Sequence, residues 1–268
     1  MKSNQRVNMP RHPFHIVDPS PWPILTAINC FGVAMGFIRW FHDKDPRLLG
    51  WRIAGLLYTL ALWWRDVIRE RTFMGHHTTY VARGLRTGML LFLLSEAIFF
   101  FGFFWAFFHS ALRPAPEIGC TWPPVGIEPI SPWAMPIANT AILLASGCTL
   151  TWAHHGLLEA NRKEALHGLA ISIILGVVFT RIQLQEYRGA HFTIADGIYG
   201  SCFYMLTGFH GLHVIIGTVF LSVNWWRTFR YHFSSVHHLG FEFGAWYWHF
   251  VDVIWILLYL CLYWWGGL

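Results

Sequence analysis

Residues 87–111 read TGMLLFLLSEAIFFFGFFWAFFHSA, an apolar run of membrane-spanning length with one ionisable side chain, Glu96, near its middle. At about 1.5 Å per residue, Glu96 lies roughly 14 Å along a helix that begins at Thr87, close to the midplane of a ~30 Å hydrocarbon core. A charge at that depth costs about 2.5–3.5 kcal/mol on insertion scales. We therefore expect Glu96 to be neutral for much of the time and to face protein or an internal water site rather than lipid.

Glu96 has only apolar neighbours on its own helical face. These neighbours are Phe92, Leu93, Phe99 and Phe100. None of them can pair with a carboxylate. Two roles stay open: a carboxylic acid that donates a hydrogen bond to a neighbouring helix, or a proton-handling group. A buried carboxyl suits both roles equally.

The composition is that of a polytopic membrane protein. The chain is 55% hydrophobic and 12% charged, whereas about 25% of the residues of a soluble domain are charged. Its 16 tryptophans fit belts at both water interfaces. The basic residues are scattered rather than gathered in a stripe, so we expect no nucleic-acid partner. The five cysteines contain no CxxC pair and are interpreted as small core residues.

Hydropathy predicts an all-α integral membrane protein with seven transmembrane helices. The expected spans are residues 22–38, 48–64, 87–111, 133–153, a fifth from about 166, a sixth that follows Asp196 and continues to Trp226, and 240–268. The first span carries Gly32-xxx-Gly36, a close-packing pattern. The fifth becomes polar from Arg181 onward, which predicts a helix that projects beyond the bilayer. Six prolines in residues 113–132 predict an ordered external loop.

A long charged connection at residues 65–86 favours a two-plus-five division of the spans. We place the first two spans in residues 1–72 and the other five in residues 73–268. Lys and Arg are more numerous in the connections on the N-terminal side of the membrane. The positive-inside rule then puts the N-terminus in a bacterial cytosol or a mitochondrial matrix, and the C-terminus on the opposite side.

The sixteen histidines raise the question of a metal site. The candidate groups are His76-His77, His154-His155, His210-xx-His213, His237-His238 and His249. A histidine-box desaturase or hydroxylase needs HxxxH and repeated HxxHH motifs, and the nearest approach, His232 with His237-His238, has the wrong spacing. Interfacial histidines that form hydrogen bonds are therefore favoured, and we assign no metal ligand. A membrane-embedded di-iron enzyme is kept as the alternative function, and stoichiometric iron would distinguish it.

Two further groups of residues suggest polar chemistry. His249 and Asp252, in WHFVD, are three residues apart on one helix and can touch. With Glu242, seven residues earlier, they form either a proton relay or, as we favour, a polar staple between helices. On the positive side, the basic and aromatic residues of WWRDVIRE (63–70) are suited to hold a lipid phosphate, or serve only as a topology signal.

These motifs together resemble one known family, the cytochrome c oxidase subunit III family, in its mitochondrial form. The similarity extends over nearly the whole chain. It is carried by DPSPWP (18–23), WWRDVIRE (63–70), GHHT (75–78), WPP (122–124), LLASG (143–147), TWAHH (151–155), FTIADGIYGS (192–201), TGFHGLHVIIG (207–217) and HHLGFEFGAWYWHFVDVIW (237–255), with LSE and FFFGFFWAFFHS around Glu96.

The resemblance implies seven helices in two groups, the first two set apart from the other five by a V-shaped cleft that holds phospholipids. It implies that this subunit carries no haem or copper and that partner subunits carry them. The implied partners are the catalytic subunit I and other oxidase subunits. The resemblance further implies a complex that passes electrons from cytochrome c to oxygen and pumps protons, and a subunit that stabilises subunit I and supports proton uptake. The implied location is the mitochondrial inner membrane, with the N-terminus in the matrix and the C-terminus in the intermembrane space.

The resemblance also implies residue roles. Glu96 matches the family's membrane carboxylate, which reacts with carbodiimides. The positions associated with cleft lipids match Trp64, Arg69, His77 and Arg227. The chain departs from the family pattern at Arg181, Arg188 and His191, which are expected on the outer side, away from Glu96. A secondary transporter is a weaker reading, because the sequence has no internal repeat.

Overall fold

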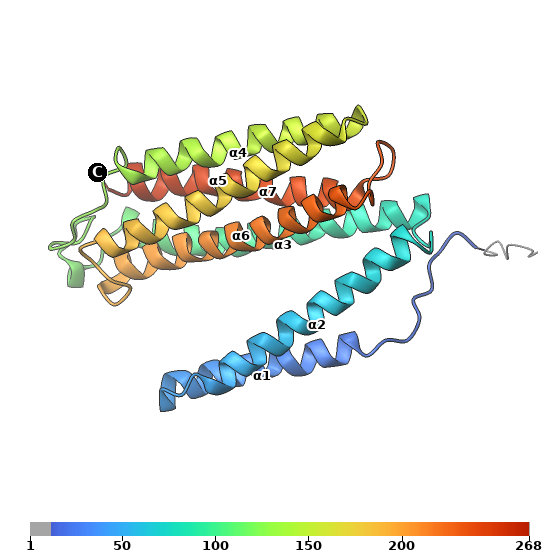
Figure 1. Cartoon of the computed structure of the whole chain (residues 1–268). Helices are drawn as coiled ribbons and strands as arrows, with labels where there is room; N and C mark the ends of the chain where they lie inside the picture. Colours follow the sequence, from blue (N-terminus) through green and yellow to red (C-terminus); the bar gives the residue numbers. More distant parts are fainter. Residues whose placement is uncertain (1–11, 268) are drawn as a thin grey trace, which may run out of the picture. The chain divides into compact units, whose positions relative to one another are not determined.

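A computed structural model describes residues 12–267, and within these residues the chain is helical without strands (Figure 1). The seven long helices of the described chain confirm the predicted fold class. The elements are α1 (Trp22–Asp43), α2 (Arg47–Thr72), α3 (Thr79–Leu112), the short 3₁₀ helix η1 (Pro116–Ile118), α4 (Met135–Leu158), α5 (Arg162–Gly189), α6 (Gly197–Phe229), α7 (Leu239–Leu258) and its π-helical continuation η2 (Tyr259–Trp265). Residues 1–11 and 268, which the predicted first domain and last span include, lie outside the described residues.

Five of these helices, α1, α3, α5, α6 and α7 with η2, are long and apolar enough to cross a membrane over the described chain. The mean hydropathy of α2 is lower because this helix carries charged residues at both ends. The mean hydropathy of α4 is lower because this helix contains hydroxyl and small side chains. At 1.5 Å per residue, the 28 residues of α5 extend about 42 Å. Its polar second half is therefore helical, as predicted.

Helix ends follow the local sequence. The helix α5 begins at a capping pair, because Asn161 accepts a hydrogen bond from the backbone N–H of Glu164 at 3.4 Å and donates one to the Glu164 carboxylate at 2.6 Å. Prolines stand in the first turns of α1 and α4, where a missing N–H costs nothing. The six-proline connection forms only η1, which confirms the predicted loop.

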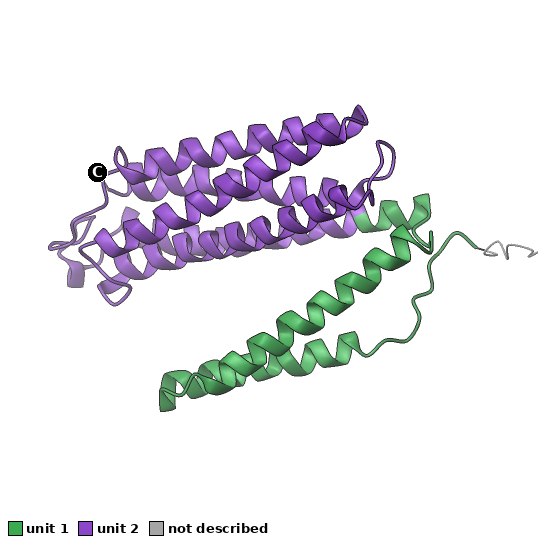
Figure 2. Cartoon of the chain, in the orientation of Figure 1, with its two compact units in different colours: residues 1–85 green, residues 86–268 purple. Residues whose placement is uncertain are grey.

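The chain separates into two compact units, residues 1–85 and residues 86–268 (Figure 2). The boundary lies inside α3, whereas the sequence placed the division after residue 72. In the first unit, α1 and α2 pack side by side as a hairpin. Gly32 and Gly36 are buried there, and a Cβ atom at Gly36 would lie 2.7 Å from the Cα atom of Leu49. The small residues thus permit close backbone contact, as the GxxxG pattern indicates.

The second unit is built around the side chain of Trp248 on α7. Its indole N–H donates to the hydroxyl of Ser146 on α4 at 2.8 Å. Its ring lies against Gly176 of α5 and Gly217 of α6, where added Cβ atoms would come within 2.6 and 2.8 Å of it. Three neighbouring helices therefore meet one fully buried tryptophan, which fixes the bundle that carries the polar groups described next.

Candidate functional site

The predicted membrane carboxylate, Glu96 on α3, has a partner on α6. Its Oε2 atom lies 2.7 Å from the Nε2 atom of His213. The side chains of Glu96 and His213 are 24% and 9% exposed. The carboxyl thus faces protein, as its depth in the apolar run predicted. The partner stands 117 residues further along the chain, so the periodicity of one helix could not reveal it.

The contact of the other ring nitrogen of His213 indicates which tautomer the ring adopts. Nδ1 lies 2.6 Å from the carbonyl oxygen of Phe209. A carbonyl only accepts, so this contact places a hydrogen on Nδ1. Nε2 and the Glu96 oxygen are then joined by one shared proton, in a neutral acid–imidazole pair or in a carboxylate–imidazolium pair. In both arrangements the hydrogen bond joins α3 to α6.

Aromatic side chains enclose the pair. The ring of Phe100 meets the His213 ring edge-on at 5.0 Å between centroids, and Tyr247 stacks on it at 6.3 Å. Phe99 packs edge-on against Phe209 at 4.9 Å. Low polarity around the pair strengthens its hydrogen bond, because few other dipoles compete for either partner.

The other predicted pair, His249 and Asp252 on α7, is in contact at 3.5 Å. The carboxyl of Asp252 is buried and reaches α4, where a Cβ atom at Gly147 would lie 2.6 Å from Oδ2. Glu242 does not extend this pair into a relay. It forms a two-point ion pair with Arg86 at 3.0 and 3.1 Å and lies 3.7 Å from His238. Asp252 therefore packs closely against α4, and the polar staple between the two helices stays a prediction.

A buried polar network went unrecognised in the sequence. The Tyr263 hydroxyl donates to Glu186 Oε1 at 2.6 Å, and the Gln183 amide donates to the same oxygen at 3.0 Å. The side-chain amide of Asn139, on α4, donates to the side-chain carbonyl oxygen of Gln183 at 3.3 Å. The polar half of α5, expected to project beyond the bilayer, therefore turns Gln183 and Glu186 into the bundle. Their i, i+3 spacing was the available signal, because it places both on one helical face.

The departures from the family pattern lie on the surface of the second unit. The side chains of Arg181, Arg188 and His191 are exposed. They share neither the Glu96 pair nor the buried network on α5.

The predicted lipid residues differ in accessibility. On α2, Trp64 is 61% exposed and the Arg69 side chain is 54% exposed, with its guanidinium 3.7 Å from Asp66. Both are open to a lipid. His77 and Arg227 are buried instead. Burial, with nearby cationic groups, lowers the pKa of His77 to about 4, so its imidazole is neutral at physiological pH and brings no charge to a phosphate.

Arg227 packs inside the second unit. Its guanidinium lies 4.2 Å from the centroid of the Phe233 ring and against the backbone of Gly240. This is a cation–π and packing arrangement at the end of α6. Its assignment to lipid stays a prediction.

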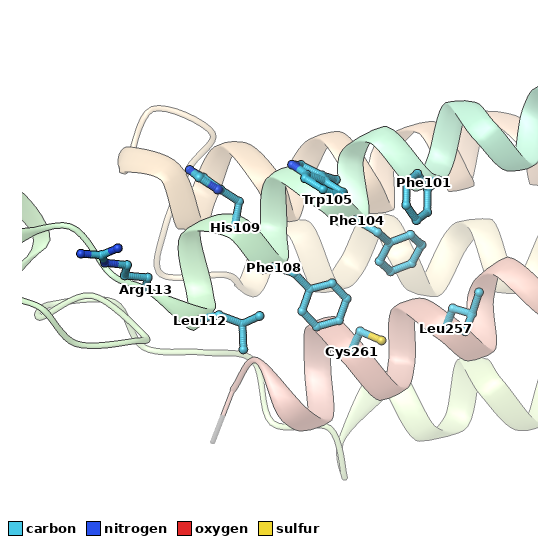
Figure 3. Close-up of a pocket in the computed structure, with 9 residues that line it drawn as sticks. All are labelled: Phe101, Phe104, Trp105, Phe108, His109, Leu112, Arg113, Leu257 and Cys261. Carbon is cyan, nitrogen blue, oxygen red and sulfur yellow. The ribbon is translucent and has the colours of Figure 1, made fainter.

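An apolar pocket of about 650 Å³ lies between the C-terminal half of α3 and the end of α7 (Figure 3). Aromatic rings of α3, among them Phe101 and Phe108, form one wall, and Leu257 with Cys261 forms the other. His109 and Arg113 stand at one end of the pocket. Such a groove is suited to an acyl chain, with cationic or polar groups at its mouth.

Most of the candidate histidines contact partners other than a common centre. The Nε2 atom of His210 lies 3.2 Å from the carbonyl oxygen of Val251, whereas His213 reaches Glu96. His154 and His238 contact each other at 3.3 Å. Within residues 12–267, a group of three metal-ligating side chains occurs once, at His15, Glu70 and His77. A histidine-box arrangement is therefore not supported.

These features define a polytopic, all-helical membrane protein whose ionisable groups pair with one another between helices. Residues 12–267 match the family model described as cytochrome c oxidase subunit III. Similar proteins named cytochrome c oxidase subunit 3 occur in Scyliorhinus canicula (58% identity), Coturnix japonica (57%) and Equus caballus (55%), each match covering 96% of this chain and 98% of the relative. The chain belongs to the cytochrome c oxidase subunit III family.

Proposed function

We propose that this chain is the non-redox core subunit of a mitochondrial terminal oxidase, placed in the inner membrane beside the catalytic subunit I. Membership of the family makes it an oxidase subunit, with other oxidase subunits as partners. In this proposal haem and copper belong to the partner subunits, and this chain binds phospholipids. The excess of Lys and Arg on the N-terminal side supports an N-terminus in the matrix and a C-terminus in the intermembrane space.

The observation that carries the proposal is the pair of Glu96 and His213. A residue that supports proton uptake must hold a proton at membrane depth and give it up at low cost. The 2.7 Å contact, with Nδ1 already engaged by Phe209, provides one site of this kind.

The test is Glu96→Gln in the assembled oxidase. The amide keeps the size of the side chain and can donate to Nε2, but it carries no exchangeable acid proton. We expect a lower steady-state ratio of protons pumped per electron or a shorter lifetime of activity during turnover. The neighbouring Ser95→Ala is the matched control, because the Ser95 hydroxyl bonds only the backbone oxygen of Phe92 within the described chain. Wild-type pumping and lifetime in Glu96→Gln would reduce Glu96 to a structural role.

A second part of the proposal concerns lipid. Trp64 offers an exposed aromatic surface for an acyl chain, and Arg69 offers a guanidinium for a phosphate on the same helix. We expect Arg69→Ala to lower the phospholipid retained by the purified oxidase, measured by mass spectrometry. Arg39→Ala, at the end of α1, is the control because its side chain is equally open, at 49% exposed. Equal lipid content in both variants would contradict the assignment.

A further inference from the structure

Three metal-ligating side chains meet in the first unit. His15, Glu70 and His77 each bring one donor atom, and these atoms lie within 4.8 Å of one another. Glu70 Oε2 is 3.9 Å from His15 Nδ1 and 4.0 Å from His77 Nε2. The donors come from three separate pieces of chain: the segment before α1, the last turns of α2, and the connection to α3.

The connection between α2 and α3 is folded back over Glu70. The backbone N–H of His76 donates to the carbonyl oxygen of Glu70 at 3.1 Å. The guanidinium of Arg71 donates to the carbonyl oxygen of His77 at 2.6 Å. Together these bonds hold the buried His77 ring beside the Glu70 carboxylate. Hydrogen bonds to backbone atoms, and not only attraction between the two side chains, therefore position these two donors.

The segment before α1 is held independently along the same end of α2. The Thr78 hydroxyl donates to the carbonyl oxygen of Pro13, and the Trp22 indole N–H donates to Asp66 at 2.8 Å. These two anchors flank His15 in the sequence. Its ring also stacks on His76, with 4.8 Å between centroids and 14° between planes. The third donor is thus delivered to the site by contacts that do not involve Glu70.

The donor set selects a class of ion. Two imidazole nitrogens and one carboxylate oxygen are ligands of Zn²⁺ and of similar divalent transition ions, whereas Mg²⁺ and Ca²⁺ prefer oxygen donors alone. Tetrahedral bonds of about 2.0–2.2 Å place ligand atoms about 3.4 Å apart. Each imidazole nitrogen would therefore have to come about half an ångström closer to the Glu70 oxygen, and the two imidazole nitrogens, which lie within 4.8 Å of each other, would have to approach by at most about 1.4 Å. Three protein ligands leave a fourth position for water.

We propose that His15, Glu70 and His77 form a binding site for Zn²⁺ or a divalent transition ion of the same ligand preference. The bound ion joins the N-terminal segment to the end of α2 and to the α2–α3 connection. This inference does not depend on the proposed role of Glu96 or on the lipid assignment, because no residue is shared with the former and only His77 with the latter. His15, Glu70 and His77 match no histidine-box spacing, and therefore the sequence predicted no metal ligand among them.

The first test is equilibrium binding of radioactive Zn²⁺ to the purified, chelator-treated oxidase. We expect Glu70→Gln and His15→Gln each to weaken one zinc site at least tenfold, with a thousandfold excess of Mg²⁺ failing to compete. His12→Gln is the control, since His12 is exposed and outside the three-donor group. Zinc bound at other sites of the complex contributes equally to the wild type and to the variants, so it does not affect the difference between them. Unchanged stoichiometry and affinity in both ligand variants would overturn the proposal.

The second test uses the unaltered protein and so does not depend on how variants assemble. Diethyl pyrocarbonate modifies free imidazole nitrogens, and mass spectrometry locates the modified histidines. Zn²⁺ should slow modification of His15 at least fivefold and leave His12 unaffected, and Mg²⁺ should protect neither. Equal modification of His15 with and without Zn²⁺, together with unaltered zinc binding in Glu70→Gln, would show that the three side chains form ion pairs only.

Discussion

The imidazole of His213 joins two elements at once, with Nε2 2.7 Å from the Oε2 atom of Glu96 and Nδ1 2.6 Å from the carbonyl oxygen of Phe209. The first contact crosses from α6 to α3, and the second stays within α6. The contact with the carbonyl oxygen places a hydrogen on Nδ1 and so fixes the tautomer of the ring. This arrangement links the packing of α3 to the protonation of a group inside the membrane.

A double-mutant cycle measures that link. Glu96→Leu leaves His213 unsatisfied, and we expect a loss of about 1–3 kcal/mol, seen as earlier thermal release of this chain from the oxidase. His213→Leu should cost a similar amount, because it orphans the carboxyl. The double variant should cost clearly less than the sum of the two, since neither polar group is then left alone. Additive losses would show that the two side chains do not interact.

The seven long helices could be predicted from sequence, but the pairing of Glu96 with His213 could not. Hydropathy registers each helix separately, so it located the apolar run around Glu96 and placed the carboxyl near its middle. The choice of His213 depends on how α6 rotates against α3. That rotation is set by large aromatic contacts such as Phe99 on Phe209, at 4.9 Å, which no single-helix pattern contains.

Tyr263→Phe tests the buried network at the end of α5. The hydroxyl donates to Glu186 at 2.6 Å, and a hydrogen bond to a charged carboxylate contributes about 1.5–3 kcal/mol. Tyr187→Phe is the comparison, because its hydroxyl donates to the neutral Thr207 at 2.7 Å and should contribute about 0.5–1.5 kcal/mol. Thermal release from the oxidase should be lowered more by Tyr263→Phe. Equal shifts in the release temperature of the two variants would mean that the hydrogen bond to Glu186 contributes no more stability than the hydrogen bond to the Thr207 hydroxyl.

The sequence located the polar stretch of α5, but it could not identify the partners of Gln183 and Glu186. Gln183 and Glu186 were expected beyond the bilayer because polar groups are costly in lipid. Partners inside the bundle offset part of this cost: Asn139 on α4 bonds Gln183 and Tyr263 on η2 bonds Glu186, while Oδ1 of Asn139 and Oε2 of Glu186 have no hydrogen-bond partner within the described residues. Only the folded bundle brings those partners together.

The two predicted lipid arginines should respond differently to truncation. Arg69→Ala removes an exposed guanidinium, and we expect less bound phospholipid with little change in thermal release. Arg227→Ala removes a buried cation that lies 4.2 Å from the Phe233 ring, and we expect a loss of about 1–3 kcal/mol in stability. Parallel lipid analysis and melting curves separate the two effects. Loss of lipid without loss of stability in Arg227→Ala would place that guanidinium on a headgroup.

A motif match could not make this distinction. The resemblance assigned Trp64, Arg69, His77 and Arg227 to lipid as a group, because it compares positions and not exposure. The structure leaves the first two open and buries the last two. The assignment of all four residues to lipid stays a prediction, and exposure favours it most for the two residues on α2.

The contact between α4 and α7 gives the sharpest packing prediction. At Gly147 an added Cβ atom would lie 2.6 Å from Asp252 Oδ2 and 3.5 Å from His249 Nδ1. Gly147→Ala must therefore push the buried carboxyl away from its histidine or separate the two helices. We expect a loss of about 1–3 kcal/mol, because overpacking and a disturbed polar pair act together.

The matched control for this prediction is Gly208→Ala on α6. A Cβ atom at Gly208 meets no heavy atom within 4 Å in the described chain. The same chemical change there should be neutral or should stabilise the helix by up to about 1 kcal/mol, because alanine restricts the unfolded chain more than glycine does. Both variants are compared by thermal release from the oxidase. If Gly147→Ala behaves like Gly208→Ala, the close approach of Asp252 to α4 does not exist in the assembled protein, and the staple between α4 and α7 must be abandoned.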